Sequence, residues 1–449
     1  MSKKEEQYDV IIVGSGFTGA TLAFNLAIAG KKVIVFEKKK KEEIGRNQQQ
    51  YVDINTYNSS KFLQTYKKAK KVTRKVFFSF SDLSQIFPLP KRDYVKFNLQ
   101  EYVNFMVDSA AKSGAKFSFD TEITDPVGRG QWVIGVKTKD GKIINGRIIV
   151  DCSGVERILT KNIEILDLNT KISSKKYVET FYSQNKIEQK EKLLNEIELE
   201  NNAFYYFFDR EFYSRIEKEN KTISFFTVLN KKLTKRKAKA VTNEIINKSK
   251  GINISPIISY SDKSVARRPI TLAWYGFLSI GEAAFQINPF NIEGSGPALI
   301  ALSIISKVLL EALQRREASI YRLWNYHTEF FKLVGKHLAA LEAFRTHILS
   351  FEKDKLLFLF KRGLISKTEI NRILDNKYPK PTVLDFLMKF FKGLSDIKTT
   401  YIFLNGLRKI NYIFNHYSKI PEEYAPKPYH DWYIKQLYLF KVFEEFCQK

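Results

Sequence analysis

Three glycines near the N-terminus have the spacing of a dinucleotide-binding turn. Gly14, Gly16 and Gly19 form a G-x-G-x-x-G pattern. In such a turn the first glycine allows a tight bend, the second lets the backbone approach a pyrophosphate, and the third lets the next helix pack closely. Glu37 follows about 20 residues later, where a carboxylate can accept hydrogen bonds from ribose hydroxyls. These residue types at this spacing predict a dinucleotide site.

The elements around these glycines are those that such a site requires. Residues 8–13 are a β-branched apolar run typical of a buried parallel strand, and residues 20–29 have the apolar spacing of a helix that Gly30 ends. Residues 32–37 form a second apolar run that ends in the acid. The helix N-terminus favours a pyrophosphate through its dipole and free N–H groups. The predicted cofactor-binding residues of this unit are Gly14, Ser15, Gly16, Phe17, Thr18, Gly19, Glu37 and Gly45.

The N-terminal unit alone does not separate FAD from NAD, but two later segments do. Residues 147–154 form an apolar strand that ends in a small-residue turn, and residues 276–285 form another buried strand with a turn. The second segment leads through Pro289 to the glycine-rich residues 293–296 and then to a long helix. Alone, this segment fits an ordinary strand–loop–helix equally well. After the first pattern in the same chain, it favours FAD.

With these residues in view, the chain resembles the geranylgeranyl reductase family of flavoproteins, within the larger group that shares the p-hydroxybenzoate hydroxylase fold. In that group an acid after a strand binds the ribityl chain, and a glycine-rich helix N-terminus faces the flavin. The resemblance therefore implies FAD. Residues 267–269 and Trp274 also resemble the archaeal branch, which reduces lipid prenyl chains. The positions that match the motif, as cofactor-binding residues, are Gly281, Glu282, Pro289, Gly294, Ser295 and Gly296.

Near the predicted cofactor site, the chain departs from the family pattern in three places. Gln49, Gln50 and Tyr51 stand where the family usually carries a Cys-Gly-acid triplet. Glu282 replaces the usual Asp and, being one methylene longer, must reposition to reach the ribityl hydroxyls. Ile292 and Glu293 replace glycines, and the Glu293 carboxylate beside the flavin would oppose the reduced, anionic form of the ring. These departures leave the FAD site in place but point to another substrate or to slowed reduction.

An aromatic run in the middle of the chain is a candidate substrate wall. It stands where the family has an aromatic motif that lines the prenyl pocket, although Asp209 replaces the proline of that motif and no Trp is present. An aromatic strand packed in a core fits the run equally well. The substrate residues that the resemblance implies are Phe204, Tyr205, Tyr206 and Phe208.

The whole pattern predicts an α/β fold: a Rossmann-type FAD-binding domain with an inserted antiparallel-sheet substrate domain and a helical C-terminal region. Short β-like runs indicate the sheet, and apolar residues at three- and four-residue spacing indicate the helices. The predicted ranges are 1–50, 95–175 and 265–330 for the FAD-binding domain, 51–94 and 176–264 for the sheet, and 331–449 for the helices.

The charge of the chain bears on its partners. It has 74 Lys and Arg against 48 Asp and Glu, a net charge of +26. No nucleic-acid module with interleaved basic and aromatic residues is recognisable, so we expect no nucleic-acid partner. An anionic membrane surface would attract clustered lysines, and a general lysine-rich bias explains the charge equally well.

The sequence also predicts the cellular location of the protein. Two cysteines and an N-terminus without the features of a signal peptide favour the cytoplasm. The apolar stretch at residues 297–313 is interrupted by polar residues and falls short of the roughly 20 apolar residues of a membrane helix. We therefore expect a cytoplasmic protein that can bind peripherally to the cytoplasmic face of the membrane.

Three functions remain in competition. The first is an FAD-dependent prenyl reductase, an oxidoreductase acting on CH–CH groups, which hydrogenates geranylgeranyl C=C bonds of membrane lipids or their precursors. The second is a monooxygenase of the same fold, and the third is a lipid-binding paralogue with impaired catalysis. No metal-ligand spacing appears in the sequence. No proton donor can be named either, because the candidates Tyr205 and Tyr206 are phenols, which are poor acids at neutral pH when unperturbed. Without a second glycine-rich unit, the electron donor stays open between ferredoxin and NADPH.

Overall fold

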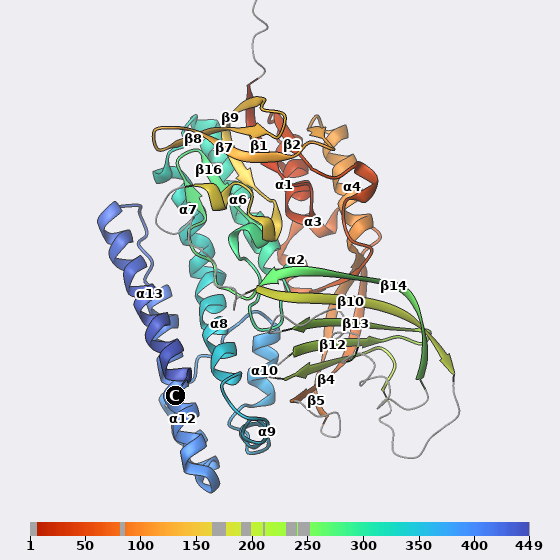
Figure 1. Cartoon of the computed structure of the whole chain (residues 1–449), viewed down its shortest axis with the longest axis vertical. Helices are drawn as coiled ribbons and strands as arrows, with labels where there is room; N and C mark the ends of the chain where they lie inside the picture. The colour runs from red at the N-terminus through yellow and green to blue at the C-terminus, as the bar shows by residue number, and fades with distance from the viewer. Residues whose placement is uncertain are drawn as a thin grey trace, which may run out of the picture.

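Two β-sheets and a set of long helices make up the protein (Figure 1). In the orientation of Figure 1 the first sheet lies at the top, the second at the lower right and the C-terminal helices on the left. Within the residues that the structure describes, each sheet has eight strands. The residues described by this computed structural model are 7–80, 86–163, 177–189, 199–209, 212–229, 240 and 252–448.

The first sheet is the predominantly parallel sheet that the N-terminal pattern predicts. Its strands are β1 (Tyr8–Val13), β2 (Val33–Phe36), β6 (Lys116–Ser118), β7 (Ile123–Arg129), β8 (Trp132–Thr138), β9 (Ile143–Asp151), β15 (Ala273–Trp274) and β16 (Phe277–Ser279). β1 pairs in parallel with β2 on one side and with β9 on the other. Val10, Ile11 and Ile12 of β1 are fully buried, as expected for a strand covered on both faces. The main path runs β15-β16-β9-β1-β2-β6.

The second sheet is antiparallel except where β11 runs parallel to β4. Its strands are β3 (Gln49–Asp53), β4 (Lys70–Phe80), β5 (Phe87–Asn98), β10 (Tyr177–Gln189), β11 (Ala203–Phe208), β12 (Phe212–Lys218), β13 (Thr222–Leu229) and β14 (Ile252–Val265). The order is β14-β10-β13-β12-β11-β4-β5-β3. The sheet thus begins at residue 49 and its first three strands reach residue 98, against the predicted range of 51–94. The predicted boundary at residues 175 and 176 lies outside the described residues.

Helices cover the first sheet near the glycine turn. They are α1 (Phe17–Ile28), α4 (Leu99–Lys112) and α6 (Ser295–Arg315), and α1 packs against both of the others. α1 begins three residues before the predicted start, because Gly16 is its N-cap and the glycine pattern itself forms the first turn. The free N–H groups of that turn therefore belong to the predicted cofactor site.

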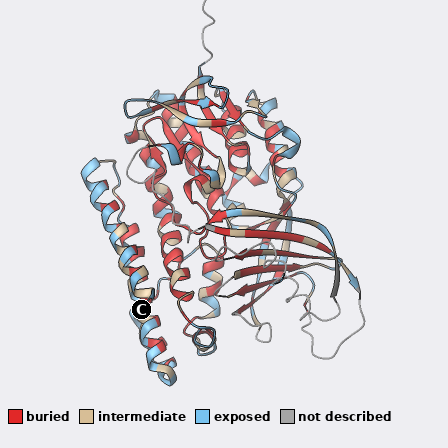
Figure 2. Ribbon diagram, in the orientation of Figure 1, coloured by how far each residue is buried: buried red, intermediate tan, exposed pale blue. Residues whose placement is uncertain are grey.

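The C-terminal third is helical, as predicted. Its long helices are buried on the side facing the rest of the protein and exposed on the outside, most clearly in α12 and α13 (Figure 2). The remaining helices are α2 (Ile54–Ser59), α3 (Lys61–Gln64), α7 (Ile320–Phe330), α8 (Lys336–Ile348), α9 (Lys353–Lys361), α10 (Lys367–Leu374), α11 (Val383–Lys392), α12 (Ile397–Tyr417) and α13 (Pro426–Gln448). Short helical turns are η1 (Lys41–Glu43), η2 (Gly154–Glu156), η3 (Thr160–Asn162), η5 (Gly281–Ala284), η6 (Phe331–Gly335) and η7 (Leu394–Asp396). Together these observations confirm the predicted α/β fold with a helical C-terminal region.

The apolar stretch near residue 300 is longer as a helix than the sequence suggests. Among the described residues, α6 is the helix whose length and composition would allow it to cross a membrane, at 21 residues and a mean hydropathy of 1.7. However, 72% of its most apolar window is buried inside the protein, against α1 and α7 among others. Its apolar character is therefore explained by packing in the core.

Candidate functional site

A cavity of about 460 Å³ lies where the carboxyl ends of the parallel strands meet the second sheet. Val13 and Phe36 border it at the ends of β1 and β2. Arg215 and Phe226 border it from β12 and β13 of the second sheet. In open α/β sheets, ligands bind outside the carboxyl ends of the strands, where the strand order reverses. The cavity lies at such a point, between β1, β2 and β9.

The glycine turn forms one wall of this cavity, and its geometry fits a pyrophosphate. Gly14 has φ +100°, and a Cβ there would lie 2.5 Å from the carbonyl oxygen of Cys152. A Cβ at Gly19 would lie 1.9 Å from the carbonyl oxygen of Gly14. In contrast, a Cβ at Gly16 would meet nothing within 4 Å, because this glycine faces the open cavity. The turn is closed behind and open in front, as close approach of a phosphate requires.

Glu37 is held against the glycine turn. Its Oε2 accepts hydrogen bonds from the backbone N–H of Ser15 at 2.8 Å and from Ser15 Oγ at 3.0 Å. Its Oε1 accepts one from the N–H of Lys39 at 3.0 Å. A carboxylate has about four acceptor positions, so about one, on Oε1, remains for a ribose hydroxyl. Glu37 borders the cavity, in the place that the sequence predicts for it.

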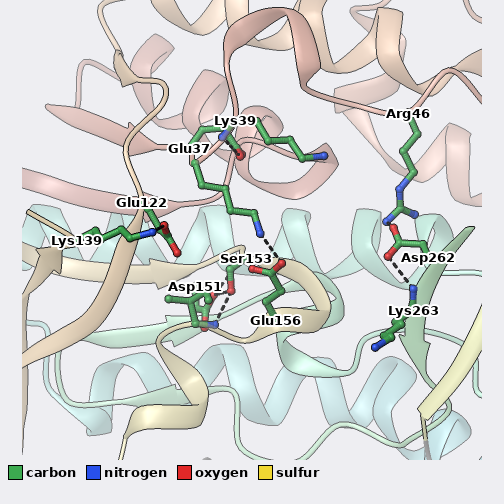
Figure 3. A network of polar contacts seen from close by, with 12 residues as sticks. Glu37, Lys39, Arg46, Glu122, Lys139, Asp151, Ser153, Glu156, Asp262 and Lys263 are labelled. Carbon is green, nitrogen blue, oxygen red and sulfur yellow. Dashed lines mark hydrogen bonds and ion pairs between the residues drawn. The ribbon is translucent and has the colours of Figure 1, made fainter. Parts of the chain in front are cut away.

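Charged residues from four parts of the chain surround this end of the cavity (Figure 3). Lys38 pairs with Glu156 of η2, next to Glu37. Arg46 pairs with Asp262 of β14, which links the loop after β2 to the second sheet. These pairs are partly exposed, so each contributes little stability by itself. Their effect is to fix the charged rim around the site.

Asp151, at the end of β9, organises the small-residue turn that was predicted within residues 147–154. Its carboxylate accepts hydrogen bonds from the N–H and Oγ of Ser153, and from the N–H of Leu159. Thr160 donates to it through both its N–H and its Oγ1. Because Ser153 borders the cavity, this buried acid shapes the wall without facing the cofactor position itself.

The second motif supplies the opposite wall. Gly281, Glu282, Gly294 and Ser295 border the cavity, and α6 begins at Ser295. Gly281 has φ +71°, and a Cβ there would lie 3.1 Å from the Thr18 side chain of α1. The two glycine-containing segments therefore lie side by side, and two helix N-termini point into one region. That arrangement favours the anionic parts of a dinucleotide.

Glu282 reaches across to the second sheet. Its Oε1 accepts a hydrogen bond from Ser264 Oγ of β14 at 2.9 Å. Burial raises the pKa of this carboxyl group, while Arg46 and the Ser264 hydrogen bond oppose the shift. The longer side chain, compared with the family's Asp, thus already has a protein partner.

Glu293 forms an ion pair with Arg215 of β12. Burial alone would lower the pKa of Arg215, but the Glu293 carboxylate and nearby tyrosines raise it above its usual value. The expected opposition between the Glu293 carboxylate and an anionic reduced flavin is therefore reduced by this ion pair. The charge of Glu293 is neutralised by an arginine that no sequence motif marks.

The structure separates the predicted cofactor residues into two groups. Ser15, Gly19, Pro289 and Gly296 lie outside the cavity lining. They act behind the wall: Ser15 bonds Glu37, Gly19 packs on Gly14, and the Pro289 carbonyl accepts a hydrogen bond from Arg345 at 2.7 Å. The predicted residues that border the cavity are Gly14, Gly16, Phe17, Thr18, Glu37, Gly45, Gly281, Glu282, Gly294 and Ser295.

The aromatic strand β11 is buried, and its side chains alternate between two faces. Phe204, Tyr206 and Phe208 face the same side of the sheet, and Phe208 stacks on Phe290 at 4.6 Å. Tyr205 faces the other side and stacks on Phe77 at 4.8 Å. The prediction that Tyr205 shares a substrate wall with the other three is wrong, because alternate residues of a strand face opposite sides. None of the four borders the cavity. Arg215, on the adjacent strand β12, does border it.

A buried polar network replaces the family's Cys-Gly-acid triplet. Tyr51 donates its hydroxyl to Glu217 of β12, while Gln50 borders the cavity. Arg74 lies 3.4 Å from Glu217 and 2.6 Å from Glu219. Burial raises the pKa of Glu217 well above its usual value. The sequence signal for this network was the pair of charged residues Arg215 and Glu217, two positions apart and therefore on one face of β12.

Residues 267–269, which suggested the archaeal branch, also lie outside the cavity. Arg268 Nη1 lies 3.2 Å from both carboxylate oxygens of Glu342, and its Nε donates to Tyr417 at 2.8 Å. This buried arginine joins the end of β14 to helices α8 and α12. Its position indicates a structural role.

The comparisons with known proteins agree with this geometry. Residues 9–45 match the FAD binding domain family. Over 93% of its length the chain is 21% identical to digeranylgeranylglycerophospholipid reductase of Sulfolobus acidocaldarius, and the match covers 95% of that relative.

The fold is shared with solved structures of flavoproteins. A geranylgeranyl bacteriochlorophyll reductase-like protein from Thermoplasma acidophilum has a TM-score of 0.66 at 13% identity, covering 89% of this chain and 100% of that one. A flavin-dependent brominase has a TM-score of 0.61 at 15% identity, covering 91% of this chain and 100% of the brominase. The chain is therefore an FAD-binding-domain protein related to digeranylgeranylglycerophospholipid reductase, with the FAD fold of the p-hydroxybenzoate hydroxylase type.

Proposed function

We propose that the protein is an FAD-dependent reductase that hydrogenates C=C bonds of geranylgeranyl chains in membrane lipids or their precursors. The observation that carries the proposal is one cavity that joins the dinucleotide turn to the second sheet, through Arg215 and Phe226. The similarity to digeranylgeranylglycerophospholipid reductase over nearly the whole chain supports the same substrate class.

The residues of the cavity divide the work of binding. The glycine turn, Glu37 and the start of α6 would hold FAD, which when bound supplies the electrons that reduce a C=C bond. An isolated alkene is poorly electrophilic, so the protein must place it against the cofactor and keep water out. The second sheet would form the wall for this task, with Phe226 as an apolar surface and with Arg215 neutralised by Glu293 of the segment before α6.

The proposal is tested by reducing the FAD-loaded protein without oxygen and adding a digeranylgeranylglycerol phospholipid. We expect the flavin absorbance to return as the lipid is consumed, and mass spectrometry to find two added hydrogens for each reduced double bond. Replacing the chemical reductant with ferredoxin or with NADPH then identifies the electron donor.

Two other outcomes would overturn the proposal in different ways. A flavin that reoxidises only when oxygen is admitted, with oxygen incorporated into an added substrate, would indicate the monooxygenase alternative. A protein that takes up neither FAD nor electrons would leave the impaired lipid-binding paralogue. The fully hydrogenated counterpart of the same lipid, which has no C=C bond to reduce, is the matched control substrate.

A further inference from the structure

Helix α11 has its apolar side toward the solvent. Val383 is 80% exposed, Leu387 53% and Phe391 66%. Within residues 383–392, all of which the structure describes, the buried side chain is that of Lys389. Surface helices of globular proteins have the opposite arrangement, with apolar residues toward the core and charges outside. The exposure of this face therefore calls for a partner.

Polar contacts hold the helix in this orientation. Lys389 Nζ donates to Glu369 Oε2 of α10 at 2.9 Å and also to the carbonyl oxygen of Leu364. At the N-terminus, Thr382 and Asp385 form a capping box, in which the Thr382 N–H donates to Asp385 at 2.7 Å. Turning the apolar side of α11 inward would break the Lys389–Glu369 ion pair and leave the part-buried Glu369 carboxylate without this partner. The outward orientation is thus a specified feature of the fold.

The exposed apolar side continues beyond α11 through η7 into the start of α12. Ten of the twenty large hydrophobic residues exposed on the described part of the chain fall within residues 383–402. Contiguous patches of this kind mark protein or membrane contacts, whereas single exposed apolar residues are ordinary. We call these ten residues the outer apolar patch: Val383, Leu384, Leu387, Met388, Phe390, Phe391, Leu394, Ile397, Tyr401 and Ile402.

The charges around the patch indicate which partner it fits. Residues 353–409 contain thirteen Lys or Arg against five Asp or Glu. Lys392 and Lys398, which lie between patch residues in the sequence, are exposed. Two copies of such a positive surface would repel each other, which argues against a homodimer. An anionic lipid bilayer satisfies both features, because its interior accepts the apolar side chains and its headgroups attract the cations.

We propose that the outer apolar patch docks on an anionic lipid bilayer, with α11 lying in the plane of the interface. Helices of this kind sink their apolar side roughly 5–10 Å into the boundary between headgroups and acyl chains. None of the ten residues borders the cavity, so the surface is independent of the proposed reaction. It would bring the protein to the membrane whatever substrate the cavity accepts.

The test is flotation of the full chain with vesicles of equal parts phosphatidylglycerol and phosphatidylcholine, compared with vesicles of phosphatidylcholine alone. We expect the wild-type protein to bind the anionic vesicles and to be released by salt. The affinity of the double variant Leu387→Glu/Phe391→Glu for the anionic vesicles should fall at least about tenfold, because two apolar side chains are lost and two negative charges are added. Both sites are exposed, so the fold should persist.

A matched control separates the patch from a general effect of charge. Ile143→Glu/Ile257→Glu makes the same change at residues that are 54% and 58% exposed elsewhere on the protein. This variant should keep at least half of the wild-type binding. Equal loss in both variants, or no binding of wild-type protein to either vesicle, would overturn the proposal.

Two further measurements keep the test decisive. Sedimentation velocity without vesicles tests whether a second copy of the chain covers the patch. A dimeric wild-type protein and a monomeric Leu387→Glu/Phe391→Glu variant would show that it does, and would overturn the membrane proposal. FAD uptake and turnover of prenyl lipid in detergent should be unchanged in this variant. A failure of the docking surface is thus distinguishable from a failure of the proposed reaction.

Discussion

Gly16 and Gly19 lie three residues apart in one turn, yet the structure gives them different tasks. Gly19 has no room for a side chain, since its Cβ would lie 1.9 Å from a backbone oxygen that cannot move aside freely. Gly16 has room for one, but that room is the cavity. The absence of a side chain at Gly19 is needed for the fold of the turn, and its absence at Gly16 keeps the cavity in front of the turn open.

Alanine at these two positions should therefore have separable effects. We expect Gly19→Ala to lower the free energy of unfolding of the FAD-free protein by roughly 1–3 kcal/mol, because the turn must open. Gly16→Ala should leave that free energy nearly unchanged but weaken FAD binding, since its methyl group enters the cavity. Urea unfolding and FAD titration by fluorescence measure the two effects. Wild-type FAD affinity in Gly16→Ala would contradict the assignment of the turn as the cofactor cradle.

Glu282 should make the stability of the FAD-free protein depend on pH. Its pKa in the folded protein is raised above the usual 4.5 by burial. The stability that comes from its protonated form is complete below pH 4.5 and is lost as the pH rises through the raised pKa. Glu282→Gln, which cannot ionise, should remove this part of the decline. The free energy of unfolding in urea, measured from pH 4.5 upward, tests this prediction. Parallel pH profiles for the wild-type protein and Glu282→Gln would contradict it.

At the scale of the element, β11 shows why position on a strand matters more than residue type. Tyr205 and Tyr206 are adjacent in sequence and both buried, but they face opposite sides of the second sheet. Tyr206 lies opposite Arg215 in the register of β11 with β12, and Arg215 borders the cavity. A substrate that extends from the cavity along this face would approach Tyr206 and not Tyr205.

The two tyrosines form a matched pair for testing the proposed substrate face. Tyr206→Leu should lower kcat/KM for the prenyl lipid about tenfold, in line with the loss of contacts in an apolar pocket. Tyr205→Leu removes the same ring from the other face and should leave kcat/KM within about twofold once both variants are shown to be folded. Steady-state kinetics measures the ratio, and equal losses in both variants would sink the assignment of the face.

The elements that the sequence specifies locally were predictable. The glycine spacing, the β-branched runs and the terminating Gly30 depend on neighbours along the chain, and the structure places β1, α1 and β2 accordingly. Arg215 was missed because its partner Glu293 is 78 residues away. The two faces of β11 were misassigned because an all-aromatic run has no alternation of polar and apolar residues to reveal them. Long-range pairing decides what local patterns cannot.

At the scale of the molecule, the cofactor site belongs to both sheets. Its wall includes residues of β1 and β2 from the first sheet and of β12 and β13 from the second. The Arg46–Asp262 pair and the Ser264–Glu282 hydrogen bond connect the two sides directly. A ligand that fills the cavity contacts both sheets, so its binding energy should stabilise the whole protein.

FAD should consequently raise the melting temperature of the protein as a unit. At a concentration about a hundredfold above its Kd, a ligand specific for the folded state adds about 2.7 kcal/mol to the free energy of unfolding. Calorimetry of the FAD-free protein with and without added FAD measures the shift, and AMP, which lacks the flavin half, is the control ligand. An unchanged melting temperature with FAD would contradict a preformed site.

The loop from Gly281 to Glu293 has a consequence for anyone who builds chimeras of these flavoproteins. Its two carboxylates are anchored on the second sheet, Glu282 on Ser264 of β14 and Glu293 on Arg215 of β12. A sheet transplanted from a relative without these partners would leave both carboxylates beside the cofactor site without a hydrogen-bond or ion-pair partner on the sheet. The substrate half of this protein is therefore not an interchangeable module, and a graft must carry the serine and the arginine or revert both acids on the loop.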